Sequence, residues 1–144
     1  MKVLKHPLHL VLIHFPSALL PMDFVCYAVY YFTKDDTFAF SAFYAMAGAV
    51  VTGWLSIVTG ALDMIKIGPD KAYLIQKALL HGGINTTVII IYSVLAYSSY
   101  KVYPQLHMPA LTILMLKAAL ICFMIVANYL GANLILKHKV GIEE

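Results

Sequence analysis

The sequence predicts an all-α membrane protein, folded as a four-transmembrane-helix up-down bundle with both termini cytoplasmic. Three observations lead to this prediction: the composition, the length of the apolar segments and the placement of the lysines. Of the 144 residues, 62% are hydrophobic and 12% are charged, against about 45–50% and about 25% in a typical soluble domain. No segment alternates like a strand, and lipid admits only helices or closed barrels. The bilayer is therefore the expected environment.

Four apolar segments are long enough to cross a bilayer, which takes about 20 residues. We expect helices at about 7–32, 37–62, 72–100 and 109–137, in one domain covering residues 1–144. The breaks contain charged residues, glycine and proline: Lys34-Asp35-Asp36, Gly68-Pro69-Asp70 and Tyr103-Pro104. The first segment exceeds the apolar stretch of a signal peptide, about 7–15 residues, so we expect it to span the membrane. Short connections make successive helices antiparallel.

The lysines indicate the direction of the helices, because cytoplasmic loops carry the excess of positive charge. Seven lysines fall on one side of the threaded bundle and two on the other: Lys2, Lys5, Lys66, Lys71, Lys77, Lys137 and Lys139 against Lys34 and Lys101. We therefore expect both termini in the cytoplasm and the chain in the plasma or inner membrane.

The composition and the missing motifs exclude several function classes. All ten cationic residues counted as Lys or Arg are lysines, whereas arginine dominates nucleic-acid recognition, so no nucleic-acid partner is expected. Cys26 and Cys122 lack the Cys-x-x-Cys spacing of a redox or metal motif. The chain has no HExxH, no Glu-x-x-His pair and no glycine-rich phosphate loop. A stand-alone enzyme is not expected.

Histidines at membrane depth are the main indication of function, because ionisable groups are costly there and imidazole is a common haem ligand. His14 lies about 10 Å along the first helix, and His81 enters the third helix to a comparable depth. The pair suits bis-histidine ligation of haem b, or of a metal ion. His9 and His138 are candidates for a second haem or a quinone. His9 and His14 are about 140° apart around the helix, so a shared ligand would need the helix to be distorted. The alternative is that these histidines only pack between helices.

Two charges lie inside the apolar segments. Asp23 in the first helix and Lys117 in the fourth have matching depths, and intramembrane charges usually pair. We predict that they form a structural ion pair, with a proton relay as the alternative. Thr59, Asp63 and Asn85 lie near the depth of His81, and such side chains can orient an imidazole through its second nitrogen. Helix–helix hydrogen bonding is the alternative.

These motifs resemble a family of small four-helix bacterial and archaeal membrane proteins of unknown function. The stretch HPLHLVLIHFPSALLPMDF at 6–24 is similar to the family signature HPLHPxxVHFP, with Leu10 in place of proline. Thr59-Gly60-Ala61-Leu62-Asp63 resembles its T-G-x-x-D, and His81 to Asn85 its H-x-x-x-N. The tail from Gly131 to Gly141 resembles its last motif, with Lys139 where glycine is common. The resemblance implies occasional fusion to Rieske or cytochrome domains, and hence electron transfer near quinone.

The sequence supports three hypotheses. The first is a membrane electron-transfer subunit that binds haem b near the cytoplasmic face. The second is a non-catalytic accessory or structural subunit of a larger membrane redox complex. The third is a proton or metal-ion conduit, although the broken-helix repeats typical of transporters are missing. The expected partners are the lipid bilayer and either other membrane redox subunits or further copies of the chain.

Overall fold

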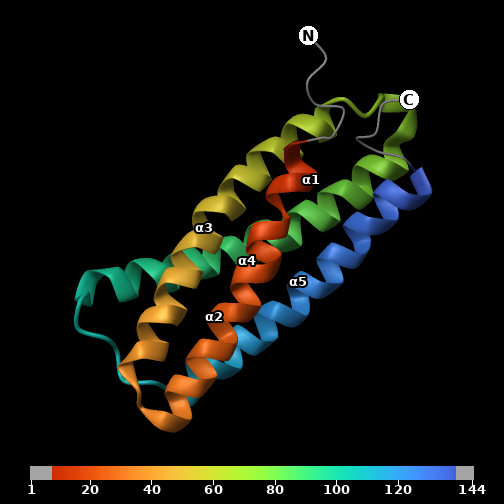
Figure 1. Ribbon diagram of the computed structural model, residues 1–144. Helices are drawn as coiled ribbons and strands as arrows, with labels where there is room; N and C mark the ends of the chain where they lie inside the picture. Colours follow the sequence, from red (N-terminus) through yellow and green to blue (C-terminus); the bar gives the residue numbers. More distant parts are fainter. Residues whose placement is uncertain (1–7, 139–144) are drawn as a thin grey trace.

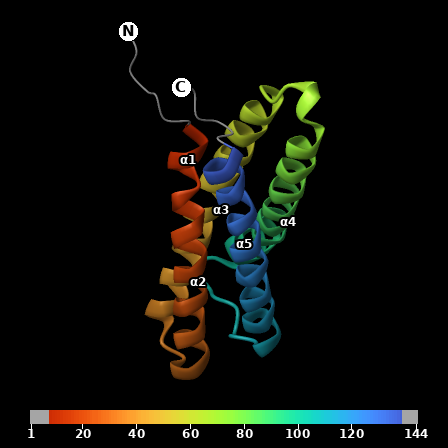
Figure 2. The same cartoon turned by 90° about the vertical axis from the view of Figure 1, so that its right-hand side faces the viewer.

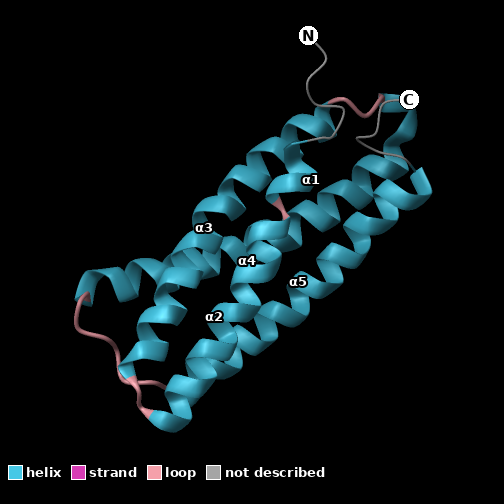
Figure 3. Cartoon of the chain, in the orientation of Figure 1, coloured by secondary structure: helices cyan, strands magenta, loops and turns pink. Residues whose placement is uncertain are grey.

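A computed structural model describes residues 8–138 of the chain, and the side chains of residues 8–136. The described residues are almost entirely helical and contain no strand (Figure 1, Figure 3). In chain order the elements are α1 (Leu8–Leu12), α2 (His14–Thr33), α3 (Asp36–Ile65), the short 3₁₀ helix η1 (Pro69–Lys71), α4 (Ala72–Val102) and α5 (Leu111–His138). The predicted all-α bundle is confirmed, and the direction of the helices through the membrane stays a prediction.

Within the described residues, four spans are long and apolar enough to cross a membrane: Leu8–Thr33, Asp36–Ile65, Pro69–Val102 and Leu111–Leu136. Only 22–28% of the most apolar stretch of each span is buried inside the protein. Most of the apolar surface therefore faces outward, where lipid covers it in a multi-pass membrane protein.

The helices form a four-membered ring. α2 packs against α3 and α5, and α4 packs against the same two helices, whereas the backbones of α2 and α4 lie diagonally across the bundle. Figure 2 shows α1 and α2 on one side of α5 and α4 on the other. All four spans contribute to one apolar core: Leu20, Met46, Ala49, Val88, Ile89, Tyr92, Leu120 and Met124.

A break at Ile13 separates α1 from α2. Pro16 has no N–H to donate, so the carbonyl of Leu12 lacks its helical partner. The chain nevertheless continues in one direction, because the N–H of Ile13 donates to the His9 carbonyl at 3.0 Å and the N–H of Ser17 donates to the Ile13 carbonyl at 3.2 Å. The break lies between His9 and His14, and it therefore bears on how these two side chains are directed.

The turn between α2 and α3 is fixed by local hydrogen bonds. Lys34 adopts a left-handed conformation with φ 60°, and its N–H donates to the Tyr30 carbonyl at 2.8 Å. Asp35 caps α3 by accepting a hydrogen bond from the N–H of Thr37 at 2.9 Å, which lowers the pKa of its carboxyl below the usual value.

Candidate functional site: a cavity between two imidazoles

A cavity of about 640 Å³ lies inside the bundle, toward the end where α1 begins and α5 ends. Every span contributes to its lining, which is mostly apolar. The polar groups in the lining include the imidazoles of His9, His14 and His81. Cofactor and small-molecule sites have volumes of about 300–1,000 Å³ and a similar mixture of apolar walls and a few polar groups. The cavity therefore has the dimensions of a binding site.

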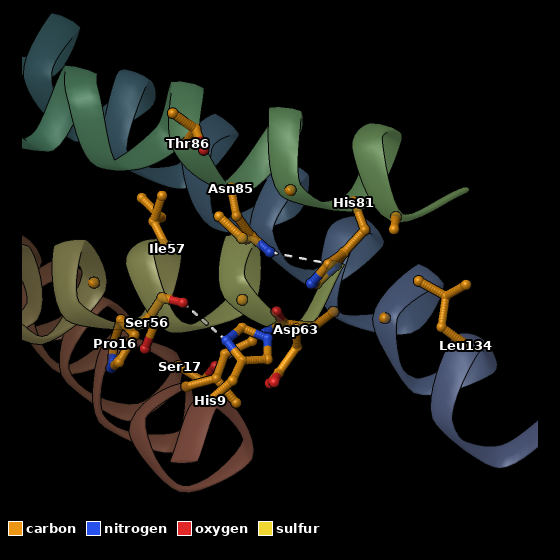
Figure 4. Close-up of a pocket in the computed structure, with 18 of the residues that line it drawn as sticks. His9, Pro16, Ser17, Ser56, Ile57, Asp63, His81, Asn85, Thr86 and Leu134 are labelled. Carbon is orange, nitrogen blue, oxygen red and sulfur yellow. Dashed lines mark hydrogen bonds between the residues drawn. The ribbon is translucent and has the colours of Figure 1, made fainter. Parts of the chain in front are cut away.

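His9 reaches across from α1 to the backbone of α3. Its Nδ1 lies 2.9 Å from the carbonyl oxygen of Ser56 (Figure 4). A carbonyl can only accept, so Nδ1 carries the proton, and Nε2 of the neutral ring keeps a free lone pair. The ring lies against Gly60, where a Cβ atom would come within 2.9 Å of Cε1.

His81 makes the corresponding contacts from α4 to α5. Its Nδ1 donates to the carbonyl oxygen of Ala127 at 2.6 Å, and the ring lies against Gly131, where a Cβ atom would come within 2.6 Å of Cε1. The amide nitrogen of Asn85 lies 3.4 Å from the same ring nitrogen (Figure 4); an amide nitrogen only donates, so it is not a hydrogen-bond partner of Nδ1 while Nδ1 carries the proton. The neutral His81 ring thus also has Nε2 available as a ligand.

The two imidazoles face a shared space. Their ring centroids are 6.4 Å apart and their planes are inclined by 81°. His14, in contrast, is exposed, and its Nδ1 donates to the Leu10 carbonyl of its own helix at 2.6 Å. Depth along the helix predicted the pair His14 and His81, whereas the structure brings His9 against His81 and leaves His14 at the border of the cavity.

Thr59 and Asp63, which the sequence predicts as partners of an imidazole, both lie near the cavity. The hydroxyl of Thr59 donates to the Ser56 carbonyl at 3.1 Å, the same oxygen that His9 contacts. Asp63 lines the cavity and accepts a hydrogen bond from Lys66 at 2.8 Å. The side chain of His138, the remaining predicted ligand, falls outside the described side chains.

Asp23 and Lys117 form a buried ion pair that ties α2 to α5. Lys117 Nζ lies 2.5 Å from Oδ1 and 2.7 Å from Oδ2 of Asp23. The two residues are 0% and 2% exposed. The ammonium group also lies 4.6 Å from the ring centre of Tyr27 and 5.9 Å from that of Tyr92, distances at which a cation is attracted to an aromatic face.

From the sequence, Gly60 and Gly131 were named only as parts of family motifs, and no glycine was given a role at the site. Gly60 and Gly131 are the surfaces on which the two imidazoles lie, and Gly82 and Gly83 also line the cavity. The available signal was the position of Gly82 and Gly83 directly after His81, because glycine inside a helix costs about 1 kcal/mol relative to alanine and calls for a reason.

The fold and the cavity define a class: a multi-pass membrane protein whose four-helix bundle carries a partly open cavity lined by histidines. Residues 5–144 match the model of the family described as "Predicted membrane protein (DUF2231)", and the chain belongs to this family. No curated protein and no solved structure matches the chain. The function therefore has to be argued from the cavity.

Proposed function

We propose that the chain is a membrane electron-transfer subunit that binds one b-type haem between His9 and His81. The spacing of the two imidazoles carries the proposal. Imidazoles on opposite sides of one metal, with metal–nitrogen bonds of about 2.0 Å, have ring centres roughly 6 Å apart. The observed separation is 6.4 Å, a distance compatible with both rings holding one group between them.

The number of ligands supports a macrocycle over a bare metal ion. No group of three or more His, Cys, Asp or Glu side chains that could hold a metal ion occurs among the residues that the structure describes. A metal held by His9 and His81 alone must bring its other ligands with it. Haem does so, because four positions of its iron are filled by the porphyrin and two remain for the protein.

The cavity also has room for a flat apolar group. A Cβ atom at Gly82 or Gly83 would meet nothing within 4 Å, so the packing of the chain itself does not call for glycine at these positions. Glycine lets a ligand approach the helix backbone closely. Gly82, directly after His81 on a mostly apolar wall, leaves such room for a flat apolar group.

When bound, haem supplies a metal centre that gains and loses one electron. The chain's own residues perform three tasks in the proposal. His9 and His81 hold the group, the carbonyls of Ser56 and Ala127 keep the proton on each Nδ1, and the apolar lining excludes water. Electrons would come from and go to other membrane redox subunits or a second copy of the chain, with a quinone as the alternative occupant of the cavity.

The test is a reduced-minus-oxidised visible spectrum of the detergent-purified native protein and four variants. We expect a sharp α band in the native protein. His9→Ala and His81→Ala should abolish it, because each removes one axial ligand. His14→Ala should retain it, which separates the structure-based pair from the pair predicted by depth. His107→Ala is the matched control, because His107 is exposed and contacts the Ser98 carbonyl at the opposite end of the bundle.

Two outcomes would overturn the proposal. One is an unchanged α band in both His9→Ala and His81→Ala. The other is a colourless native protein that contains no metal by elemental analysis and co-purifies with membrane partners at a fixed stoichiometry. That second result would identify an accessory subunit whose histidines serve only packing.

A further inference from the structure

The bundle consists of two hairpins, one formed by α1, α2 and α3 and the other by α4 and α5. Both contain the same arrangement of a histidine, a backbone carbonyl and a glycine. In α3 the carbonyl that binds His9 belongs to Ser56, four residues before Gly60. In α5 the carbonyl that binds His81 belongs to Ala127, four residues before Gly131. In both halves a histidine from the first helix of a hairpin lies on a glycine of the second helix. The number of residues from His9 to His81 equals the number from Gly60 to Gly131 to within one residue, and the same holds from Ser56 to Ala127.

Burial follows the same interval from the cavity to the middle of the bundle, but not toward the opposite end, where Cys26 is buried and its counterpart Ser98 is exposed. Leu20 and Tyr92 occupy equivalent positions, and both are almost completely buried. Four further equivalent pairs are buried as well: Pro16 with Val88, Met46 with Lys117, Ala49 with Leu120 and Gly53 with Met124. The packing agrees, because α2 on α5 is the counterpart of α4 on α3. The part of the bundle around the cavity is therefore built from two similarly arranged hairpins, each of which contributes one imidazole.

Glycine explains why each carbonyl can be reached. The Cα–Cβ bond of a helical residue tilts toward the N-terminus, so its side chain covers the preceding turn. A side chain at Gly60 would cover the Ser56 carbonyl, and one at Gly131 would cover the Ala127 carbonyl. A backbone carbonyl has two lone pairs, so it can accept from an imidazole in addition to its helical N–H.

The steric limits are tight at both positions. A Cβ atom would lie 2.9 Å from Cε1 and 3.0 Å from Nδ1 of His9 at Gly60, and 2.6 Å and 2.9 Å from the same atoms of His81 at Gly131. Ordinary contact begins at about 3.5 Å. Each ring would have to move by half an ångström or more, on the order of the tolerance within which a functional group must be held. The movement would be away from the carbonyl to which its Nδ1 is bonded.

We infer that Gly60 and Gly131 are positioning residues: each lets an imidazole lie on the helix backbone and bond a carbonyl through Nδ1, which directs Nε2 of both rings toward one shared ligand. The inference rests on the proposed function for the identity of that ligand. It adds that both imidazoles would hold the same ligand, each through Nε2.

The first measurement needs no haem. The ring ¹⁵N shifts of histidine-labelled protein in bicelles report which nitrogen carries the proton. We expect the Nδ1–H form for His9 and His81 in the native protein. Gly60→Ala should change the signals of His9 only, and Gly131→Ala those of His81 only. Gly48→Ala is the control, because Gly48 also lies in α3, a Cβ there would meet only the end of the Leu19 side chain at 3.3 Å, and it does not line the cavity.

The second measurement is haem affinity by spectroscopic titration of the same variants. Loss of a group that orients a ligating histidine typically weakens metal binding about 10- to 100-fold, and we expect this range for Gly60→Ala and Gly131→Ala. Helix propensity favours alanine over glycine, so a folding failure would itself report the clash with the imidazole.

The outcomes separate the two proposals. Nδ1–H signals that respond to the glycine variants in a protein that never binds haem would leave the positioning role intact and remove the proposed function. Haem binding that is equal in the native protein, Gly60→Ala and Gly131→Ala would remove the positioning role and leave the proposed function. Nε2–H forms of both histidines in the native protein would also overturn the positioning role.

Discussion

The buried pair of Asp23 and Lys117 gives the sharpest prediction about stability. Equivalent positions in the other hairpin interface are held by Leu95 and Met46, which belong to the apolar core or pack against it. The positions that correspond to the ion pair in the other hairpin are thus filled by apolar residues. The double variant Asp23→Leu/Lys117→Met places the same apolar residue types at the two charged positions.

The single variants and the double variant should differ strongly. Asp23→Leu leaves the Lys117 ammonium buried without its partner, and Lys117→Met does the same to the Asp23 carboxylate. Removing one member of a buried pair costs about 3–5 kcal/mol, whereas replacing both by apolar side chains is often neutral or stabilising by about 1–4 kcal/mol. We therefore expect each single variant to lose at least about 3 kcal/mol and the double variant to recover nearly all of it.

The assay is unfolding in mixed micelles, followed by the fluorescence of the chain's single tryptophan. Trp54 is a suitable reporter because its Nε1 donates to Ser93 Oγ at 3.1 Å and so links α3 to α4. Lys101→Met is the matched control. Lys101 is exposed, with its ammonium 5.8 Å from the Tyr97 ring centre, a contact worth about 0.5–1 kcal/mol at an exposed site.

Two results would refute the reasoning. Single variants that each lose less than about 1 kcal/mol would mean that the pair is not desolvated as its burial indicates. A double variant that loses the sum of the two single losses would mean that the charges act independently, and hence that they are not partners in the folded protein.

Two smaller predictions concern helix contacts and caps. Gly53→Leu should lower the free energy of unfolding by about 1–3 kcal/mol, as overpacking does, because even a Cβ at Gly53 would overlap Ile89 of α4. The same micelle assay measures this loss. An unchanged unfolding midpoint would contradict the close packing of α3 on α4. Asp35→Ala should remove the cap on the N–H of Thr37 and destabilise the protein only where the carboxylate is charged. Since the pKa of Asp35 is lowered in the folded state, its contribution is present above the ordinary carboxyl value of 3.8 and is lost as the pH falls through the lowered value. Unfolding midpoints of the native protein and the variant should therefore differ at neutral pH and converge in acid.

The four-helix fold could be predicted from the sequence because every membrane-spanning helix has to meet the same requirement. A helix that crosses lipid must be about 20 apolar residues long, and charges, glycine and proline mark its ends. The pairing of Asp23 with Lys117 followed from depth, since neither charge is tolerable alone in hydrocarbon. In the structure these two side chains are in contact.

The histidine pair was harder to predict, because depth gives only one coordinate. His9 and His14 differ by about 140° around a regular helix, and the choice between them depends on which backbone lies opposite. His9 meets Gly60 and an open carbonyl, whereas His14 bonds a carbonyl of its own helix. Neither contact is encoded in the spacing of residues within one segment, so the opposing glycine had to be seen in three dimensions.

The ion pair also bears on the geometry of the cavity. His9 and His81 belong to different hairpins, so their separation depends on how the two hairpins are aligned along the length of the bundle. Apolar contacts tolerate small sliding movements, whereas a displaced buried charge loses its partner, and a single buried polar group is known to fix the register of packed helices. Asp23 and Lys117 form such a fixed point between α2 and α5, reinforced by Asn128 Nδ2, which donates to Ser17 Oγ at 3.0 Å. We therefore expect the double variant Asp23→Leu/Lys117→Met to keep its stability and to bind haem more weakly than the native protein. Native affinity in that variant would show that apolar packing alone aligns the two imidazoles.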